Sequence, residues 1–371
     1  MATVTPSDSG PAHLGDFPEE GTVKASPVPD DCFYEVVDGQ IVELPPMGAY
    51  ECDVASFLAF MLGQVVHAQQ LGKVVVETLF WLDRAGKILG PAGEPGLCVN
   101  VALSPDGRRA ALARPGPQGT NIWLLDFANK SLASFTFGKN GSEYPVWSTD
   151  GRQIFFCSLR DGNYNLYRKP ANGEKDEELL LRSHEDKTPT SCSGDGRYLL
   201  YTARDQKTKN DLWVLPLEGD LKPIPFLRTE FDEWDGHFSP DTRWIAYVSN
   251  ESASNEVYVR AFAPGSTAAF SESGAKWMVS MGGGTAPRWR ADGKELFYLG
   301  PDGRVMSVDV TVDTTFHGGT SKPLLQPPMR GFSGAWNVAA DGKRFLFMAP
   351  KELGTPTPFT VVLNWQVGLR K

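Results

Sequence analysis

One short pattern, an aspartate turn between two apolar runs, occurs six times in the 371 residues of this chain. Its copies include LSPDGRRAALA, WSTDGRQIFFC and FSPDTRWIAYV, and successive aspartates lie 44 to 51 residues apart. The next residue is glycine in five copies, and the one after it is Arg or Lys in all six. Asp-Gly between apolar runs predicts a hairpin, because glycine accepts a positive φ and aspartate tolerates it. The turn aspartates, interpreted as structural, are Asp106, Asp150, Asp195, Asp241, Asp292 and Asp341.

A third apolar segment follows most of these hairpins, and a short fourth segment comes after it. The third segments begin at residues 121, 165, 211 and 256, and residues 131–137 exemplify the fourth. Three to four antiparallel strands in a unit of about 45 residues are typical of a β-propeller blade. The sequence therefore predicts a mainly β fold, with a six-bladed propeller over residues 78–366 and a short tail over 367–371.

Such a ring has to close, because an open edge strand presents unpaired backbone groups. The last repeat has its turn at Asp341, and residues 359–365 are predicted to be its third strand. Two additional apolar segments, 79–83 and 87–89, precede the first repeat. We predict that residues 78–90 complete the last blade.

The segment before the repeats has a different pattern. Residues 1–30 are rich in Pro, Gly, Ser and acidic residues, which predicts a disordered tail without the features of a secretory signal. Residues 31–77 predict a small ββαβ fragment. Its hairpin is expected over 33–44, its helix over the apolar face of 54–65, and its last strand over 73–80.

Composition restricts the function classes. The net charge is −9, which disfavours nucleic acid and anionic membranes as partners, since both attract positive charge. The five cysteines include no CxxC pair, and the five histidines show no metal-ligand spacing, so no cofactor is expected. We expect a cytoplasmic monomer that binds a protein or peptide, or a small polar ligand.

The repeats resemble the TolB-like propeller, a relative of the WD-repeat fold. They resemble in particular the C-terminal propeller of many bacterial, especially acidobacterial, serine/threonine protein kinases. The match is carried by LFWLDRAGK, NVALSPDGRRAALA, YVSNESASNEVYVRAF, APRWRADGKELFY, DGKRFLFM and VVLNW. The resemblance implies a non-catalytic sensing or protein-interaction module. The chain lacks the HRD and DFG motifs of a kinase and the GxSxG elbow of a propeller-linked serine peptidase.

Residues 33–80 resemble the beginning of the Uma-two family of restriction-endonuclease-like proteins. The match is carried by FYEVVDGQIVELPPMGAYE and LGKVVVETLF, in which Glu35 and Glu77 match early positions of the family pattern. Carboxylates suit a nuclease because Mg²⁺ prefers oxygen ligands and activates the attacking water. The later acids of the pattern are absent, because the chain has already become the propeller. A metal-dependent endonuclease activity, residual or lost, is the alternative function.

The propeller itself predicts where a ligand would bind. The innermost strand of each blade lines the central channel, and alignment of the repeats places six side chains at its mouth. The predicted channel residues are Asn100, Tyr144, Asp235, His237, Arg288 and Asn337.

A calcium role for the turn aspartates is the alternative to their structural role, but they lack the clustered spacing of a calcium loop.

Overall fold

The computed structural model describes residues 34–37, 40–43, 77–93, 98–117, 119–139, 141–205, 207–263, 275–312, 315–327 and 336–350. The chain divides into two units, one of residues 75–353 and one of residues 1–74 with 354–371. In the latter, β1 (Tyr34–Val37) and β2 (Gln40–Glu43) pair as an antiparallel hairpin where the sequence predicts one. The predicted helix over 54–65 and the tails over 1–30 and 367–371 lie outside the described residues.

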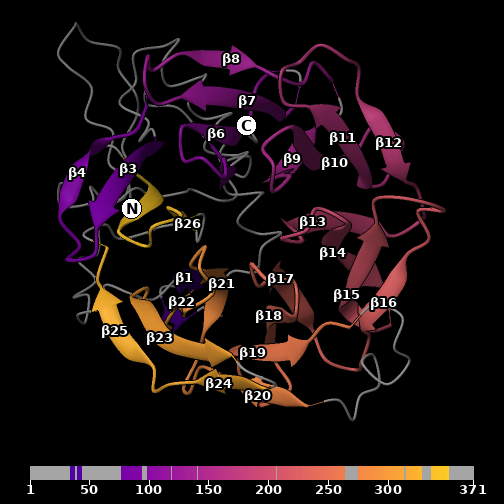
Figure 1. Ribbon diagram of the computed structural model, residues 1–371. Coiled ribbons are helices and arrows are strands. Elements are labelled where there is room, and N and C mark those ends of the chain that lie inside the picture. Colours follow the sequence, from indigo (N-terminus) through magenta and orange to yellow (C-terminus); the bar gives the residue numbers. More distant parts are fainter. Residues whose placement is uncertain are drawn as a thin grey trace, which may run out of the picture. The chain divides into compact units, whose positions relative to one another are not determined.

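Residues 75–353 form a six-bladed β-propeller, as the repeats predict (Figure 1). Each aspartate turn joins the first and second strands of a blade, because the apolar runs on both sides of the turn pair antiparallel. Blade 1 contains β5 (Asn100–Leu103), β6 (Arg109–Arg114), β7 (Asn121–Asp126) and β8 (Leu132–Ser134). Blade 2 contains β9 (Ser142–Trp147), β10 (Gln153–Ser158), β11 (Asn165–Pro170) and β12 (Glu178–Leu181).

The next two blades repeat this arrangement, and the fifth adds a strand. Blade 3 contains β13 (Asp186–Cys192), β14 (Tyr198–Asp205), β15 (Lys209–Pro216) and β16 (Ile224–Leu227). Blade 4 contains β17 (Glu233–Phe238), β18 (Trp244–Ser249), β19 (Glu256–Ala261) and β20 (Lys276–Met278). Blade 5 contains β21 (Thr285–Trp289), β22 (Glu295–Leu299), β23 (Val305–Val312), β24 (Phe316–Gly318) and β25 (Lys322–Leu325). Both β24 and β25 pair with β23.

Blade 6 closes the ring with strands from both ends of the propeller sequence. Its order is β26 (Trp336–Val338), β27 (Arg344–Pro350), β3 (Glu77–Asp83) and β4 (Ile88–Pro91). Closure by residues 78–90 is thereby confirmed. The third strand was predicted wrongly, because β3 pairs directly with β27 and occupies the third position, which we assigned to residues 359–365. Those residues lie outside the described part of the chain.

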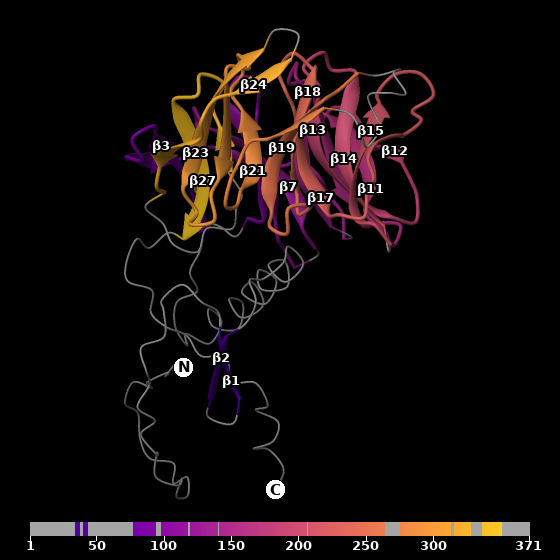
Figure 2. The same ribbon diagram turned by 90° about the horizontal axis from the view of Figure 1, so that it is seen from below.

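The core is divided among the junctions between blades. The second strand of a blade is buried on both faces, so its residues are apolar in an unbroken run rather than in alternation. In β10, for example, Ile154 and Phe156 pack toward blade 1, whereas Phe155 and Cys157 pack toward blade 3. The alternating direction of side chains along a strand therefore gives every blade two apolar faces. Figure 2 shows the blades side by side around the ring.

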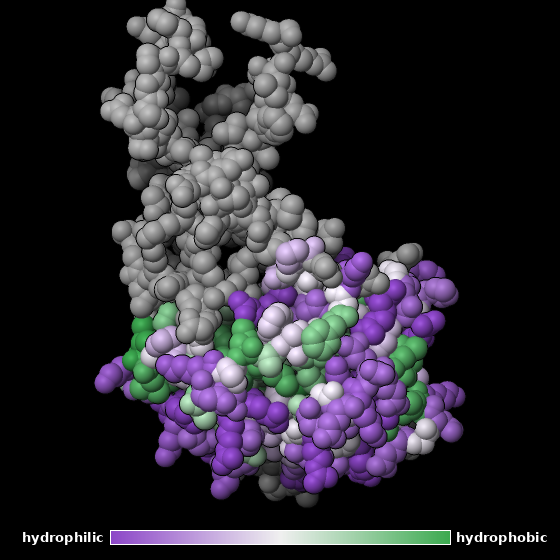
Figure 3. All heavy atoms as spheres, turned by 90° about the horizontal axis from the view of Figure 1, so that it is seen from above, coloured by the Kyte–Doolittle hydropathy of each residue, from purple (hydrophilic) through white to green (hydrophobic). Residues whose placement is uncertain are grey.

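The exposed surface of the propeller is mostly hydrophilic, with separate hydrophobic patches, on the face shown in Figure 3. Within the described residues, no helix is long and apolar enough to cross a membrane.

Candidate functional site in the central channel

The innermost strands β5, β9, β13, β17, β21 and β26 follow one another around the central axis (Figure 1). All six predicted channel residues lie on these strands: Asn100 on β5, Tyr144 on β9, Asp235 and His237 on β17, Arg288 on β21 and Asn337 on β26. The structure brings them together in separate groups rather than in one cluster.

Asp235, His237 and Arg288 form the largest of these groups. Arg288 Nη1 lies 2.7 Å from His237 Nε2 and 3.3 and 3.4 Å from the two carboxylate oxygens of Asp235. It also donates to the carbonyl of Pro287 at 2.7 Å. His237 Nε2 in turn lies 3.0 Å from Asp235 Oδ1. About a sixth of each of the three side chains remains exposed, namely 18%, 18% and 17% for His237, Asp235 and Arg288.

A β-bulge in β17 shapes this group. The pairing of β17 with β18 shifts between Trp234 and His237, and Asp235 has a φ of 48°. Left-handed backbone is uncommon outside glycine, although aspartate tolerates it better than most residues. The next residue, Gly236, has to be glycine, because a Cβ at this position would lie 2.8 Å from the side chain of Leu200 in the neighbouring blade. Blades 2 and 5 have the same irregularity, with a φ of 52° at both Tyr144 and Ala286, so the bulge is a feature of the innermost strands that an Asp-Gly pair accommodates in blade 4.

Asp235 and His237 differ in their charge at neutral pH. Burial disfavours the ionised form of Asp235, but the Arg288 charge and the His237 contact outweigh it and hold the pKa of this carboxyl well below its usual range. Burial and the positive charge of Arg288 lower the pKa of His237, against the opposing effect of Asp235. At neutral pH the group is therefore an ion pair beside a neutral imidazole.

The two contacts of His237 Nε2 exclude each other as hydrogen bonds. An arginine N–H only donates, so Nε2 must be unprotonated to accept from Arg288, whereas it must carry the proton to donate to Asp235. The imidazole can therefore exchange one partner for the other by changing its tautomer. Within the described residues, no hydrogen bond is recorded for Nε or Nη2 of Arg288. The guanidinium can thus turn donors toward a ligand.

The other predicted channel residues join neighbouring blades. Asn100 Oδ1 accepts a hydrogen bond from the backbone N–H of Tyr144 at 3.2 Å, which connects blades 1 and 2. Asn337 Nδ2 donates to the carbonyl of Val101 at 2.9 Å, which connects blades 6 and 1. Both amide side chains therefore have a structural partner.

Two residues near the channel were not predicted from the sequence. Ser191, on β13, accepts a hydrogen bond from the backbone N–H of Phe238 at 3.2 Å. Alignment on Asp195 would have found this position. The other is Trp289, whose indole N–H donates to the carbonyl of His237 at 3.1 Å. Its place next to Arg288 was the available signal.

The turn aspartates use their carboxylates locally. Each accepts a hydrogen bond from the backbone N–H two residues later, at 2.9 to 3.2 Å. In blades 1 to 4 the same oxygen also accepts from a serine hydroxyl two residues earlier, at 2.6 Å. No group of three or more His, Cys, Asp or Glu side chains in the described residues could hold a metal ion.

The endonuclease alternative stays a prediction. Glu35 is on β1 and Glu77 begins β3, and these strands belong to different units of the chain. The side chains of both glutamates lie outside the described set. Mg²⁺-dependent cutting of plasmid DNA that is lost in Glu35→Ala would support this activity.

The fold and the repeats define a TolB-like six-bladed β-propeller. A solved structure from Agrobacterium tumefaciens, described as a candidate TolB, aligns with a TM-score of 0.58 and 16% identity. The alignment covers 76% of this chain and 100% of that one. No protein-family model matches the chain.

Two curated relatives match part of the sequence. One is an uncharacterized peptidase, YuxL of Bacillus subtilis, 25% identical in an alignment of length 191 that covers 40% of this chain and 28% of that protein. The other is an uncharacterized protein, Atu1656 of Agrobacterium fabrum, 28% identical in an alignment of length 156 that covers 39% of this chain and 52% of that protein. The chain thus spans about a quarter to a half of these relatives.

Proposed function

We propose that the propeller is a non-catalytic binding module that holds a protein or peptide segment by a carboxylate at Arg288 in the central channel. The observation that carries this proposal is the double contact of His237 Nε2. When a ligand carboxylate takes the Arg288 donors, His237 changes tautomer and donates to Asp235 instead. No buried group then loses its only hydrogen bond, so a ligand can bind without the usual cost of an unpaired partner.

Asp235 already balances the charge of Arg288, so the feature that suits a carboxylate is the pair of donors on Nε and Nη2. Guanidinium binds carboxylates in a planar, two-point geometry, and the partial burial of Arg288 reduces competition from water. A small polar ligand with a carboxylate would use the same contacts. The proposal includes no peptidase activity, although the Bacillus subtilis relative is named a peptidase, because the sequence of this chain contains no GxSxG motif.

The test is a selection from a displayed library of short peptides, with half of the library carrying a free C-terminal carboxylate and half amidated. Selected peptides are then titrated against the full chain by calorimetry. We expect carboxylate peptides that bind at least about tenfold more weakly to Arg288→Met, with partial recovery in Arg288→Lys. The matched control is Arg304→Met, since Arg304 is an exposed arginine in a turn of blade 5. Equal affinity for the wild type and Arg288→Met would refute the proposal.

A further inference from the structure

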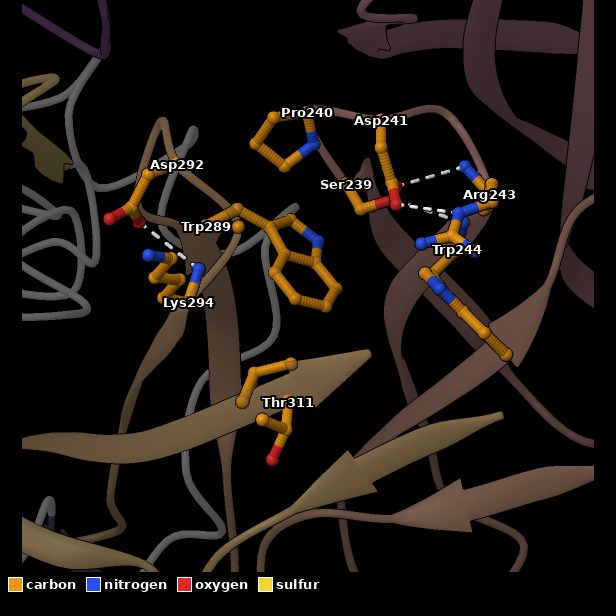
Figure 4. Close-up of a pocket in the computed structure, with 11 residues that line it drawn as sticks. Ser239, Pro240, Asp241, Arg243, Trp244, Trp289, Asp292, Lys294 and Thr311 are labelled. Carbon is orange, nitrogen blue, oxygen red and sulfur yellow. Dashed lines mark hydrogen bonds and ion pairs between the residues drawn. The ribbon is translucent and has the colours of Figure 1, made fainter. Parts of the chain in front are cut away.

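A cavity of about 650 Å³ lies between blades 4 and 5, outside the channel group just described. Pro240 and Trp244 of blade 4 and Trp289, Lys294 and Val310 of blade 5 are among its lining residues. In Figure 4 the indole of Trp289 lies between the Asp292–Lys294 turn on one side and Arg243 and Trp244 on the other. The volume falls in the range of pockets that bind small ligands or a few peptide residues.

Other junctions fill the corresponding space with side chains. Between blades 1 and 2, the guanidinium of Arg109 lies over the ring of Trp147, 4.9 Å from its centroid. Between blades 3 and 4, Phe262 packs against Tyr198 and Phe238, with ring centroids 5.2 and 5.0 Å apart. The space beside the first strand is thus covered by a long or aromatic side chain in both cases.

Between blades 4 and 5 both covering positions differ. Trp244 takes the place of Arg109 and Tyr198, three residues after the turn aspartate. It is 95% buried and packs inward against Trp277 and Phe316, with centroids 5.3 and 5.8 Å away. Val310 takes the place of Phe262, since both donate their backbone N–H to the residue two after the turn aspartate. Blade 2 has Ala171 at the same position, but Arg109 covers the space there. Between blades 4 and 5 neither Trp244 nor Val310 covers it, and the cavity follows from the two positions together.

The rim of the cavity carries two acids, Asp241 and Asp292, and two cations, Arg243 and Lys294. Asp241 pairs with Arg243, whose Nε lies 2.7 Å from Oδ2. Asp292 pairs with Arg290 through two contacts of 2.6 and 2.8 Å. Arg290 also pairs with Glu295, which has a second arginine partner in Arg84. Each rim acid therefore has an arginine partner, and Lys294 is the exposed cation that can contact a ligand.

We propose that this cavity, the groove between blades 4 and 5, binds an extended, proline-containing peptide segment with an acidic residue beside the proline. Tryptophan and proline walls suit a prolyl ring, because proline-rich segments are already extended and lose little entropy in aromatic-lined grooves. Lys294 provides the complementary charge for the acidic residue. This site is separate from the channel and does not depend on Arg288.

The test uses fluorescein-labelled Ac-APPDPPEA and its polarisation with the full chain at low salt. The companion peptides replace the acids by lysine or the prolines by glycine. We expect binding of the acidic proline peptide alone, weakened at least about tenfold by Lys294→Glu and by Thr311→Tyr, which fills the groove from an exposed position. Lysine peptides should bind Lys294→Glu better than they bind the wild type.

The controls separate this site from the channel. Lys343→Glu changes the exposed lysine at the same position of blade 6 and should leave binding unchanged. Arg288→Met should also leave binding of this peptide unchanged. The groove proposal and the channel proposal can therefore fail independently, and the experiment shows which of them has failed. Absence of binding to the wild type, equal binding of the glycine peptide, or equal binding to Lys294→Glu and Thr311→Tyr would overturn the inference.

Discussion

The indole N–H of Trp289 donates to the backbone carbonyl of His237 at 3.1 Å, so a wall of the groove between blades 4 and 5 is bonded to the channel group. Trp289 also directly follows Arg288 in β21. A substitution of Trp289 that removes this bond should therefore be detectable at His237. The two proposed binding sites are physically adjacent, although their ligands differ.

Trp289→Phe tests this connection. The substitution leaves the carbonyl of His237 without its donor, and we expect a loss of about 1 kcal/mol in the free energy of unfolding and a shift of the His237 imidazole signals in NMR spectra. The matched control is Trp147→Phe, because Trp147 Nε1 donates to the carbonyl of Ala102 at 3.0 Å in the equivalent position. It should cost a similar amount of stability and leave His237 unchanged. Identical His237 spectra in both variants would contradict the connection.

Arg288→Met should change the titration of His237. The positive charge of Arg288 helps to lower the pKa of this histidine, while Asp235 acts in the opposite direction. Without Arg288 the imidazole faces an unopposed carboxylate, so its pKa should rise and the ring should become protonated at a higher pH. Histidine NMR signals followed from pH 4 to 8 measure this, with Arg288→Lys as the variant that keeps the charge. An unchanged pKa in Arg288→Met would show that the charge of Arg288 does not act on His237, and a lower pKa would contradict the predicted direction.

Glu233 should make the stability depend on pH near neutrality. Burial, with a contribution from the charge of Asp211, raises the pKa of Glu233 to about 7, although a hydrogen bond from Thr229 opposes the rise and Glu251 adds to it. The folded protein thus binds a proton that the unfolded chain releases at about pH 4.5. The resulting stabilisation, about 3 kcal/mol, is fully present below that pH and is lost as the pH rises to about 7.

Glu233→Gln should remove this dependence. Denaturant unfolding between pH 4.5 and 7.5 should show a flatter free-energy profile for Glu233→Gln than for the wild type. The control is Glu230→Gln, an exposed glutamate three residues earlier. Parallel profiles for Glu233→Gln and the wild type would be inconsistent with a proton held at this site.

The turn aspartates should differ in their importance. Asp150 accepts hydrogen bonds from the Ser148 hydroxyl at 2.6 Å and from the backbone of Arg152 at 3.0 Å. Blade 6 has alanine in place of that serine, and Asp341 accepts from the backbone of Lys343 at 2.9 Å. Asp150→Ala should therefore lower the unfolding free energy by about 1 kcal/mol more than Asp341→Ala. Chemical denaturation of the two variants measures the difference, and an equal or smaller loss in Asp150→Ala would contradict it.

Ring closure gives a test on a larger scale. Removal of residues 1–76 leaves β3 and β4 in place, whereas removal of residues 1–93 leaves β27 paired with β26 alone. We expect a markedly lower melting temperature for the second truncation alone. In the full chain, Leu82→Ala should cost about 2–5 kcal/mol, because Leu82 is fully buried between blades 5 and 6. Equal melting of the two truncations would contradict closure by β3 and β4.

The blades were predictable because their signal is local. An Asp-Gly turn and its two apolar runs lie within about a dozen residues, so the hairpin around Asp150 can be read without knowledge of the rest of the chain. The third strand of blade 6 was assigned wrongly because β3 is separated from β27 by most of the sequence, and two apolar segments competed for one position. Periodicity could not decide between them.

The channel site was predictable in position but not in its contacts. Alignment placed Asp235, His237 and Arg288 on innermost strands, but their meeting depends on the bulge at Asp235 and on the approach of Gly236 to Leu200. The bond of Asn337 to Val101 spans 236 residues and has no local signal. The groove also depends on Val310, which stands where blade 4 has the larger Phe262. The aligned repeats contain this difference, but its effect on the space between the blades is visible only in the packing.

The closure of blade 6 also has a consequence for synthesis of the protein. The β3–β4 hairpin leaves the ribosome early, and β27 begins 261 residues after β3 ends. At a translation rate of about 5–20 residues per second, the apolar edge of β3 stays unpaired for roughly 15–50 s before β27 is synthesised. During that time an exposed strand edge can pair with other chains. The protein should thus be most prone to aggregate while it is being translated, and slower translation should increase that risk.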